Sequence, residues 1–318
     1  MDTLQYLLGG FAVALTWTNL GIAALGSLIG TIVGMLPGLG PINGVAILMP
    51  IAFALKLPPE TALILLASVY LGCEFGGRIS AILLNVPGDA GAIMTTLDGY
   101  PMAKAGQAGV ALSISAWSSF VGGIVATVGF VLFAPLLARW ALAFGPAEYF
   151  ALMVFAFACI TGLMGDEPMK AALAAIIGLA LATVGLDSNS GVYRFTADNV
   201  HLSDGIQFIV VVIGLFSVSE VLLMLEQHFT STGMVKATGR SMFNWKEMAL
   251  TWWGTVRSSV VGFIVGVLPG AGATIASAMT YTMEKNIAGA SGTFGKGDIR
   301  GVAAPEAANN ASAGGSFV

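Results

Sequence analysis

Long apolar runs broken by very few charges are the feature that most limits what this chain can fold into. A helix needs about 20 apolar residues to cross the hydrocarbon core of a bilayer. Runs of that order recur along the 318 residues, and only 9% of the residues are charged, whereas a soluble domain carries about a quarter. Thirteen Lys and Arg with seventeen Asp and Glu cannot coat a soluble body of this size. We therefore predict an all-α, polytopic membrane protein.

The apolar segments differ in length, and several do not fit a plain membrane crossing. We expect them near residues 4–36, 42–55, 61–86, 108–137, 147–165, 171–186, 205–225, 252–268, 272–283 and 302–318. The first is long enough for a bent helix plus an interfacial piece, whereas 42–55 and 272–283 are too short to cross alone. Short apolar helices beside a Gly/Pro break are typical of re-entrant or broken helices.

Loop charges predict the sidedness of the second half. Seven of the thirteen Lys and Arg lie within residues 230–300, whereas loop 187–204 is mainly acidic. The basic region should face the cytoplasm. Because basic loops flank both sides of residues 266–272 (GVLPGAG), we expect a helical hairpin there that returns to the same side, with its tip at 269–272.

The hairpin tip has a counterpart near the start of the chain. Residues 27–40 (SLIGTIVGMLPGLG) and 259–272 (SVVGFIVGVLPGAG) are identical at nine of fourteen positions. We interpret this as an internal repeat within a single transmembrane domain, 1–318, with one repeat over about 20–135 and an incomplete second over about 250–318. Glycines at every fourth position make a smooth helix face for close packing. For Gly26, Gly30 and Gly262, packing alone is an equally good explanation.

The Pro-Gly-x-Gly ends of the two repeats predict broken helices. Proline and glycine stop a helix, and a break at membrane depth is tolerated only beside a cavity or buried protein. The helix that follows points its positive N-terminus at that cavity. A further break lies at residues 85–91 (NVPGDAG). Duplicated breaks of this kind indicate the central site of a transporter.

Glu74 and Arg78 are four residues apart inside an apolar run. A lone charge at the bilayer centre costs at least ~2.5–3.5 kcal/mol, so each charge needs a partner. In one interpretation the two side chains neutralise each other and lock two helices together. In the other, Arg78 also meets a carboxylate of the transported molecule.

Several blocks stand in one order along nearly the whole chain: residues 34–40 (GMLPGLG), 76–78 (GGR), 85–88 (NVPG), 98–103 (DGYPMA), 144–150 (FGPAEYF), 214–220 (GLFSVSE), 268–270 (LPG) and 304–310 (APEAANN). Together they resemble the large membrane subunit of the tripartite tricarboxylate transporters, the TctA family. Members of that family continue beyond this chain and carry a second Pro-Gly break after Ala-Gly-Gly. The resemblance therefore implies a C-terminally truncated permease that lacks the second half of its site.

The resemblance also implies a function and partners. It implies a multi-pass permease of the bacterial inner membrane that works with a small membrane subunit and a periplasmic solute-binding protein. The cargo would be citrate or a related carboxylate, driven by a cation gradient with sodium as the expected ion and no other cofactor. The alternatives are a carboxylate permease of another family that needs no binding protein, an inactive fragment, and a non-transporting scaffold.

Few buried cations are available to meet a citrate-like anion, so helix N-termini and backbone amides should contribute to binding. The expected substrate-binding residues are Gly38, Gly40, Asn43, Arg78, Asn85, Gly88, Gly270, Gly272, Thr274, Asn309 and Asn310. Oxygen ligands suit a hard cation such as sodium, and the expected cation-binding residues are Asp89, Asn85 and Glu306. Asp89 has an alternative role as the cap of the following helix.

Other classes of protein are disfavoured. Gly289-Ala290-Ser291-Gly292 matches the Gly-x-Ser-Gly of rhomboid-like proteases but lies in a polar loop, away from His201 and His228. We therefore do not expect an enzyme. No P-loop is present, and two cysteines and two histidines do not form a metal motif. A net charge of −4 without a basic cluster argues against nucleic acid as a partner.

Overall fold

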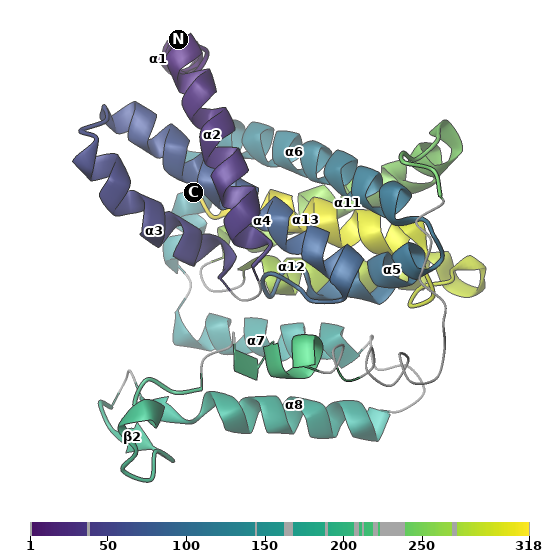
Figure 1. The fold of residues 1–318 in the computed structure, drawn as a ribbon. Helices are drawn as coiled ribbons and strands as arrows, with labels where there is room; N and C mark the ends of the chain where they lie inside the picture. The colour runs from purple at the N-terminus through teal and green to yellow at the C-terminus, as the bar shows by residue number, and fades with distance from the viewer. Residues whose placement is uncertain are drawn as a thin grey trace.

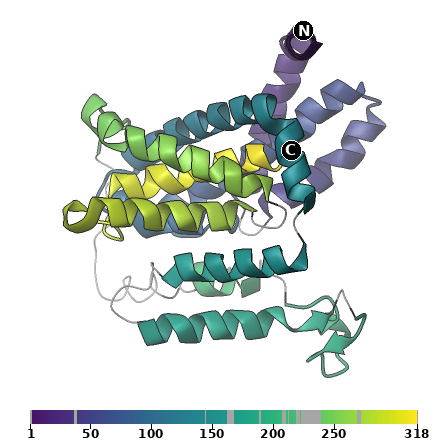
Figure 2. The same ribbon diagram turned by 180° about the vertical axis from the view of Figure 1, so that it is seen from behind.

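The structure, a computed structural model, describes residues 2–36, 39–143, 145–161, 168–187, 190–206, 210–211, 213–218, 222, 239–268 and 272–317. Most of these residues are helical, and the helices lie side by side in a bundle (Figures 1 and 2). The α-helices are α1 (Asp2–Ala14), α2 (Trp17–Gly34), α3 (Gly40–Ala54), α4 (Pro59–Leu84), α5 (Ile93–Lys104), α6 (Ala108–Ala143), α7 (Pro146–Thr161), α8 (Pro168–Ala182), α11 (Trp245–Val267), α12 (Gly272–Ala288) and α13 (Ile299–Gly315). The short elements are strands β1 (Gly185–Leu186) and β2 (Tyr193–Arg194), the 3₁₀ turns η1 (Val200–Leu202) and η3 (Gly289–Ser291), and the π-helical η2 (Ile213–Val218).

The prediction of an all-α, polytopic membrane protein is confirmed. Within the described residues, α2, α4, the first 26 residues of α6 and α11 are each long and apolar enough to cross a membrane. Large apolar side chains such as Phe53, Leu63 and Phe120 are exposed on the outside of the bundle. Such a surface suits lipid, which accepts the apolar side chains that water would reject.

The helix boundaries depart from the sequence prediction in two places. The segment 4–36 is two helices, α1 and α2, because the chain breaks before Thr16, whose hydroxyl caps α2 by accepting a hydrogen bond from the Asn19 amide. Helix α5 was not predicted, because it carries Thr95, Thr96, Asp98 and Lys104 and so lacks an apolar run. Ten of the 21 residues of the predicted segment 205–225 lie outside the described residues.

Helix α13 lies in the middle of the bundle and packs against α4, α5, α6, α11 and α12. Nearly every residue along it is buried, although its sequence is only weakly apolar. Its side chains are mainly Ala, Gly, Ser and Asn, and small side chains allow helices to approach it from all sides. The yellow helix in Figures 1 and 2 is therefore enclosed by its neighbours.

The glycine faces of α2 and α11 form two matching helix crossings. Helix α2 packs on α4, and α11 packs on α13. At four glycines an added Cβ would collide with a carbonyl oxygen of the facing helix: 2.2 Å from Val69 at Gly30, 2.1 Å from Cys73 at Gly34, 2.4 Å from Ala308 at Gly262 and 2.2 Å from Ser312 at Gly266. The expectation that these glycines serve packing is confirmed at Gly30 and Gly262. The bounds of the two repeats stay a prediction.

Helices α11 and α12 form the expected hairpin, although residues 269–271 at its tip lie outside the described residues. A bidentate ion pair joins its two arms, with Arg257 Nε and Nη2 each 3.0 Å from a Glu284 carboxylate oxygen. Because α11 alone is long enough to cross a membrane, its end need not lie at mid-depth. The sidedness of the hairpin stays a prediction.

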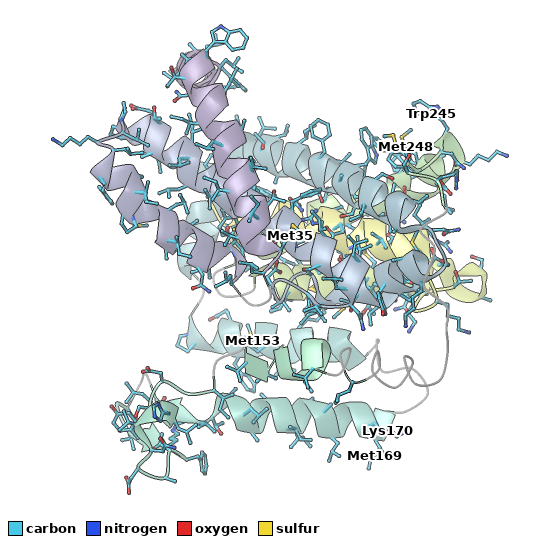
Figure 3. The ribbon with its side chains drawn as sticks, in the orientation of Figure 1. Met35, Met153, Met169, Lys170, Trp245 and Met248 are labelled. Carbon is cyan, nitrogen blue, oxygen red and sulfur yellow. The ribbon has the colours of Figure 1, made fainter. Side chains whose placement is uncertain are left out.

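Helices α7 and α8 form a separate layer beside the bundle and run in opposite directions (Figures 1 and 2). Met169 and Lys170 mark the start of α8, and Met153 lies on α7 (Figure 3). Trp245 and Met248 mark the outer end of α11 (Figure 3). Strands β1 and β2 pair in antiparallel fashion after α8. The layer of α7 and α8 lies away from the polar residues in the interior of the bundle.

Candidate functional site

The polar interior of the bundle lies where α4 ends and the chain folds back. Asn85 ends α4 in a left-handed conformation (φ 58°, ψ 25°). The turn that follows is tied to the helix, because the Gly88 amide donates to the Gly77 carbonyl at 3.2 Å. A Cβ on Gly88 would lie 2.1 Å from the Gly34 carbonyl oxygen, so only glycine allows α2, α4 and this turn to meet. The 85–91 break predicted from the sequence is therefore present, and it brings Asp89 against α4.

A buried ion pair connects α4 to α13. Arg78 Nε lies 2.6 Å from Glu306 Oε2, and both side chains have no exposed surface. Thr95 of α5 donates a short hydrogen bond to the other oxygen of Glu306. The Phe75 ring covers the guanidinium, with its centroid 5.3 Å from Arg78 Cζ. The ion-pair partner of Arg78 is therefore Glu306 and not Glu74, as one interpretation of the sequence had it. Toward Glu74, Arg78 Nε donates a hydrogen bond to the backbone carbonyl, at 3.1 Å.

Several polar atoms around this ion pair have no hydrogen-bond partner among the described residues. They are Arg78 Nη1 and Nη2, Glu74 Oε2, Asp89 Oδ2, and both atoms of the Asn309 amide. All four residues are buried. Burying a polar group without a partner costs about 1–3 kcal/mol, and more for a charged group. A cluster of such atoms in a folded protein calls for further partners, such as a bound ligand, an ion or water.

The missing Cβ atoms of Gly77 and Gly91 let Asp89 and Asn309 come close together. A Cβ on Gly77 would lie 2.5 Å from Asp89 Oδ2. A Cβ on Gly91 would lie 2.9 Å from Asn309 Nδ2 and 3.0 Å from Asp89 Oδ1. Gly40, at the start of α3, approaches from another side, since its Cβ would lie 3.7 Å from Asp89 Cβ. The break in the first repeat therefore contributes to this cluster.

Asp89 uses its two oxygens differently. Oδ1 accepts a hydrogen bond from the Ala92 amide at 3.1 Å, just before α5 begins. This bond closes the turn before α5, but Asp89 is not the cap of that helix: the N-cap position is Ala92, and no side chain caps it. Asp89 Oδ2 has no hydrogen-bond partner within the described chain.

The unpartnered atoms fall into two chemical groups. The donors are Arg78 Nη1, Arg78 Nη2 and Asn309 Nδ2. The acceptors are Glu74 Oε2, Asp89 Oδ2 and Asn309 Oδ1. Donors in this arrangement suit a carboxylate, because the two outer guanidinium nitrogens bind its two oxygens together. The acceptors suit a hard cation. No three His, Cys, Asp or Glu side chains within the described residues have the geometry of a metal centre, so a cation here would need the amide and backbone oxygens as well.

Not every predicted residue reaches this cluster. Asn43, Gly272 and Thr274 are exposed, and the Asn43 amide donates back to the Leu39 carbonyl. Gly38 and Gly270 lie outside the described residues. Asn85 acts as a helix cap, and its role as a cation ligand stays a prediction. The structure brings together six of the predicted residues: Arg78, Gly88, Asp89, Glu306, Asn309 and Gly40. The sequence analysis did not assign Glu74 or Thr95 to the binding site, although both belong to the cluster.

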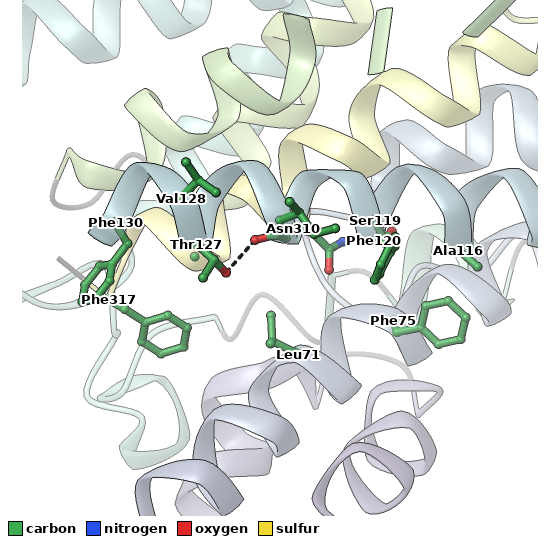
Figure 4. A pocket seen from close by; sticks show the side chains of 13 residues that line it. Leu71, Phe75, Ala116, Ser119, Phe120, Thr127, Val128, Phe130, Asn310 and Phe317 are labelled. Carbon is green, nitrogen blue, oxygen red and sulfur yellow. Dashed lines mark hydrogen bonds between the residues drawn. The ribbon is translucent and has the colours of Figure 1, made fainter. Parts of the chain in front are cut away.

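A groove of about 720 Å³ between α4, α6 and α13 opens beside the cluster (Figure 4). Its walls are mainly apolar, with Leu71, Phe120 and Phe317 among them, and its polar atoms come chiefly from Ser119, Thr127 and Asn310. The Asn310 amide donates to the Glu306 carbonyl at 3.2 Å. Phe75, which covers Arg78, also lines the groove. Phe75 is therefore shared between the groove wall and the ion pair, whereas Arg78 and Glu306 do not line the groove themselves.

Comparison with known proteins places these features in a family. The model of the tripartite tricarboxylate transporter TctA family matches residues 20–318. The chain belongs to the TctA family. This is a family of transporters.

Two relatives from Agrobacterium vitis are similar to this TctA-family chain. An uncharacterized 52.8 kDa protein in the TAR-I ttuC' 3' region is 40% identical over all 318 residues, which cover 63% of that protein. An uncharacterized protein in the TAR-II ttuC' 3' region is 51% identical over 57 residues, 18% of this chain and 24% of that protein. The chain thus spans less than two thirds of the length of the first relative. No solved structure matches the chain.

Proposed function

We propose that this chain is the large permease subunit of a binding-protein-dependent secondary transporter in the bacterial inner membrane. It imports citrate, another tricarboxylate or a related carboxylate together with a cation, with sodium as the expected ion. Its partners are a small membrane subunit and a periplasmic solute-binding protein, as the family description implies. The activity belongs to the complete protein.

One observation carries the proposal: the buried guanidinium of Arg78 keeps its two outer nitrogens without partners beside unpartnered oxygens of Glu74 and Asp89. A charged group is retained in the apolar interior of a membrane protein when function requires it. Donors for a carboxylate and acceptors for a cation lie in one cluster, which supports binding of both together. The helix breaks around the cluster support a central transport site.

The first test is uptake of labelled carboxylates into native membrane vesicles that contain the chain. Citrate and a panel of C4–C6 di- and tricarboxylates are supplied with a sodium gradient or with choline, each with and without periplasmic extract. We expect uptake that needs both sodium and the extract. Uptake that ignores the extract would favour the alternative of an ordinary carboxylate permease. No uptake of any carboxylate would contradict the proposal for this chain and favour an inactive fragment.

A further inference from the structure

The ion pair of Arg78 and Glu306 has a consequence for how the two transported species depend on each other. The guanidinium is the single positive side chain in the described cluster, and Glu306 already neutralises it at 2.6 Å. Thr95 fixes Glu306 from the far side. A carboxylate that reaches Arg78 Nη1 and Nη2 therefore meets no net positive charge.

Two further carboxyl groups in the cluster bring no positive charge to it. Glu74 and Asp89 are buried in the same cluster, and among the described residues Glu74 Oε2 and Asp89 Oδ2 have no hydrogen-bond partner. The Glu74 carboxyl lies beside the Asn309 side chain, and both Asn309 Nδ2 and Asp89 Oδ1 lie near the Cβ position of Gly91, at 2.9 and 3.0 Å. An arriving anion adds a further negative charge to a region of low dielectric constant. Such a charge is tolerated only if a cation enters with it.

We propose that Glu306 is the residue that makes carboxylate binding depend on the co-transported cation. Because its negative charge occupies Arg78, the incoming anion cannot bind on the guanidinium alone. The cation lies on the acceptor side, between Glu74, Asp89 and the Asn309 amide oxygen, and restores the charge balance. This inference rests on the proposed function, since it concerns the same anion and cation.

Glu306→Gln separates the charge of this residue from its shape. Glutamine has nearly the same volume and can still accept the Thr95 hydrogen bond, but it leaves the Arg78 charge free for the anion. We expect the variant to bind carboxylate without the cation. The slope of log affinity against log sodium concentration should fall by about one relative to the unmodified chain.

The measurement is equilibrium binding of labelled citrate and the carboxylate panel to the purified full chain, across a sodium series balanced with choline and repeated at a second pH. Glu284→Gln is the matched control, because Glu284 is also buried and paired with an arginine, Arg257, but lies in the α11–α12 hairpin. The control should keep the sodium slope. A Glu306→Gln slope equal to that of the unmodified chain would overturn the inference.

Glu306→Asp keeps the test usable if the glutamine variant does not fold. Aspartate retains the charge and only withdraws the carboxylate, so the cation slope should persist. Loss of that slope would show that charge is not the determinant and would overturn the inference. If the unmodified chain binds a carboxylate without any cation dependence, the inference fails while the carboxylate site stands. If it binds no carboxylate at all, the proposed function fails with it.

Discussion

Gly40 and Gly272 begin the helices after the two Leu-Pro-Gly breaks with the same left-handed backbone, at φ +59° and +58°. Both positions have room for a side chain, since an added Cβ would meet nothing within 4 Å at Gly272 and only Asp89 Cβ, at 3.7 Å, at Gly40. The requirement for glycine is therefore set by the backbone and not by packing. The glycines that follow the two breaks therefore share one left-handed φ as well as one place in the sequence motif.

Replacing either of these glycines by alanine should destabilise the protein by a similar amount. A left-handed conformation costs an L-residue about 1–2 kcal/mol, and no clash adds to it. Thermal unfolding in detergent micelles measures the effect. Gly21→Ala in α2 is the control, because nothing lies within 4 Å of its Cβ position and its backbone is helical, so alanine should be neutral or stabilising there. Unequal effects at the two positions would argue against a shared conformation.

The glycine crossing of α2 and α4 gives a prediction about packing. A Cβ on Gly30 would lie 2.2 Å from the Val69 carbonyl oxygen, so Gly30→Ala should push the helices apart and cost about 1–3 kcal/mol. Gly262→Ala should do the same between α11 and α13, where the corresponding distance is 2.4 Å to Ala308. The free energy of unfolding in urea and mixed micelles is the readout. Stability equal to that of Gly21→Ala would contradict the described crossing.

The buried ion pair predicts a large coupling between Arg78 and Glu306. Removing one partner leaves an uncompensated buried charge, so Arg78→Gln or Glu306→Gln alone should cost about 3–5 kcal/mol. The double variant should cost less than the sum of the two. The same cycle on Arg257 and Glu284 should give a smaller coupling, because Arg257 is partly exposed. Additive effects at Arg78 and Glu306 would contradict their contact.

Asp98 holds the loop between α12 and α13 against α5. Its carboxylate accepts hydrogen bonds from the Tyr281 hydroxyl at 2.7 Å and from the amides of Gly295, Gly297 and Asp298 at 2.8–2.9 Å. Asp98→Ala leaves these donors without an acceptor and should release the loop. Tryptic cleavage after Lys296, which requires local unfolding, should then accelerate. Asp98→Asn keeps an acceptor oxygen and should be cut more slowly than the alanine variant; equal rates would contradict this role.

The same loop should show a stability change in acid. Burial by itself raises the pKa of Asp298, but hydrogen bonds from the Arg300 side chain and from the Thr293 and Arg300 amides outweigh burial and hold the pKa below its usual value. A lowered pKa stabilises the fold above the pKa of the unfolded chain, and this contribution is lost as the pH falls through the lower, folded value. Melting temperatures measured from pH 6 downward should therefore drop less in Asp298→Asn than in the unmodified chain. Identical pH profiles would contradict the contribution.

Much of the fold follows from the sequence, because apolar length and Gly/Pro breaks act locally. The helices around residues 61–86, 108–137 and 252–268 and the short helix after the first break were predictable for that reason. Helix α5 was not, since its polar residues Thr95 and Asp98 are buried by contacts with α13 and its preceding loop. Burial of this kind depends on tertiary partners that no hydropathy pattern contains.

The candidate site was predictable in its parts but not in its pairing. The charge at Arg78 and the break at Asp89 are visible in the sequence, whereas the choice of Glu306 over Glu74 depends on α13 packing closely beside α4. Asn43 and Thr274 were predicted to bind substrate because each follows a break, yet both lie on the exposed face of their helix. Spacing along one helix sets which residues share a face, but it does not set which helix that face meets.

The central claim is that Arg78 binds the transported carboxylate, and Arg78→Lys tests it most directly. Lysine keeps the charge opposite Glu306 but loses the paired outer nitrogens that suit a carboxylate. Arg257→Lys is the matched control, because Arg257 makes a bidentate ion pair away from the site. Sodium-driven uptake of labelled carboxylate into vesicles, at equal amounts of folded protein, should be lost in Arg78→Lys and kept in Arg257→Lys. Uptake by Arg78→Lys with unchanged affinity would contradict the account.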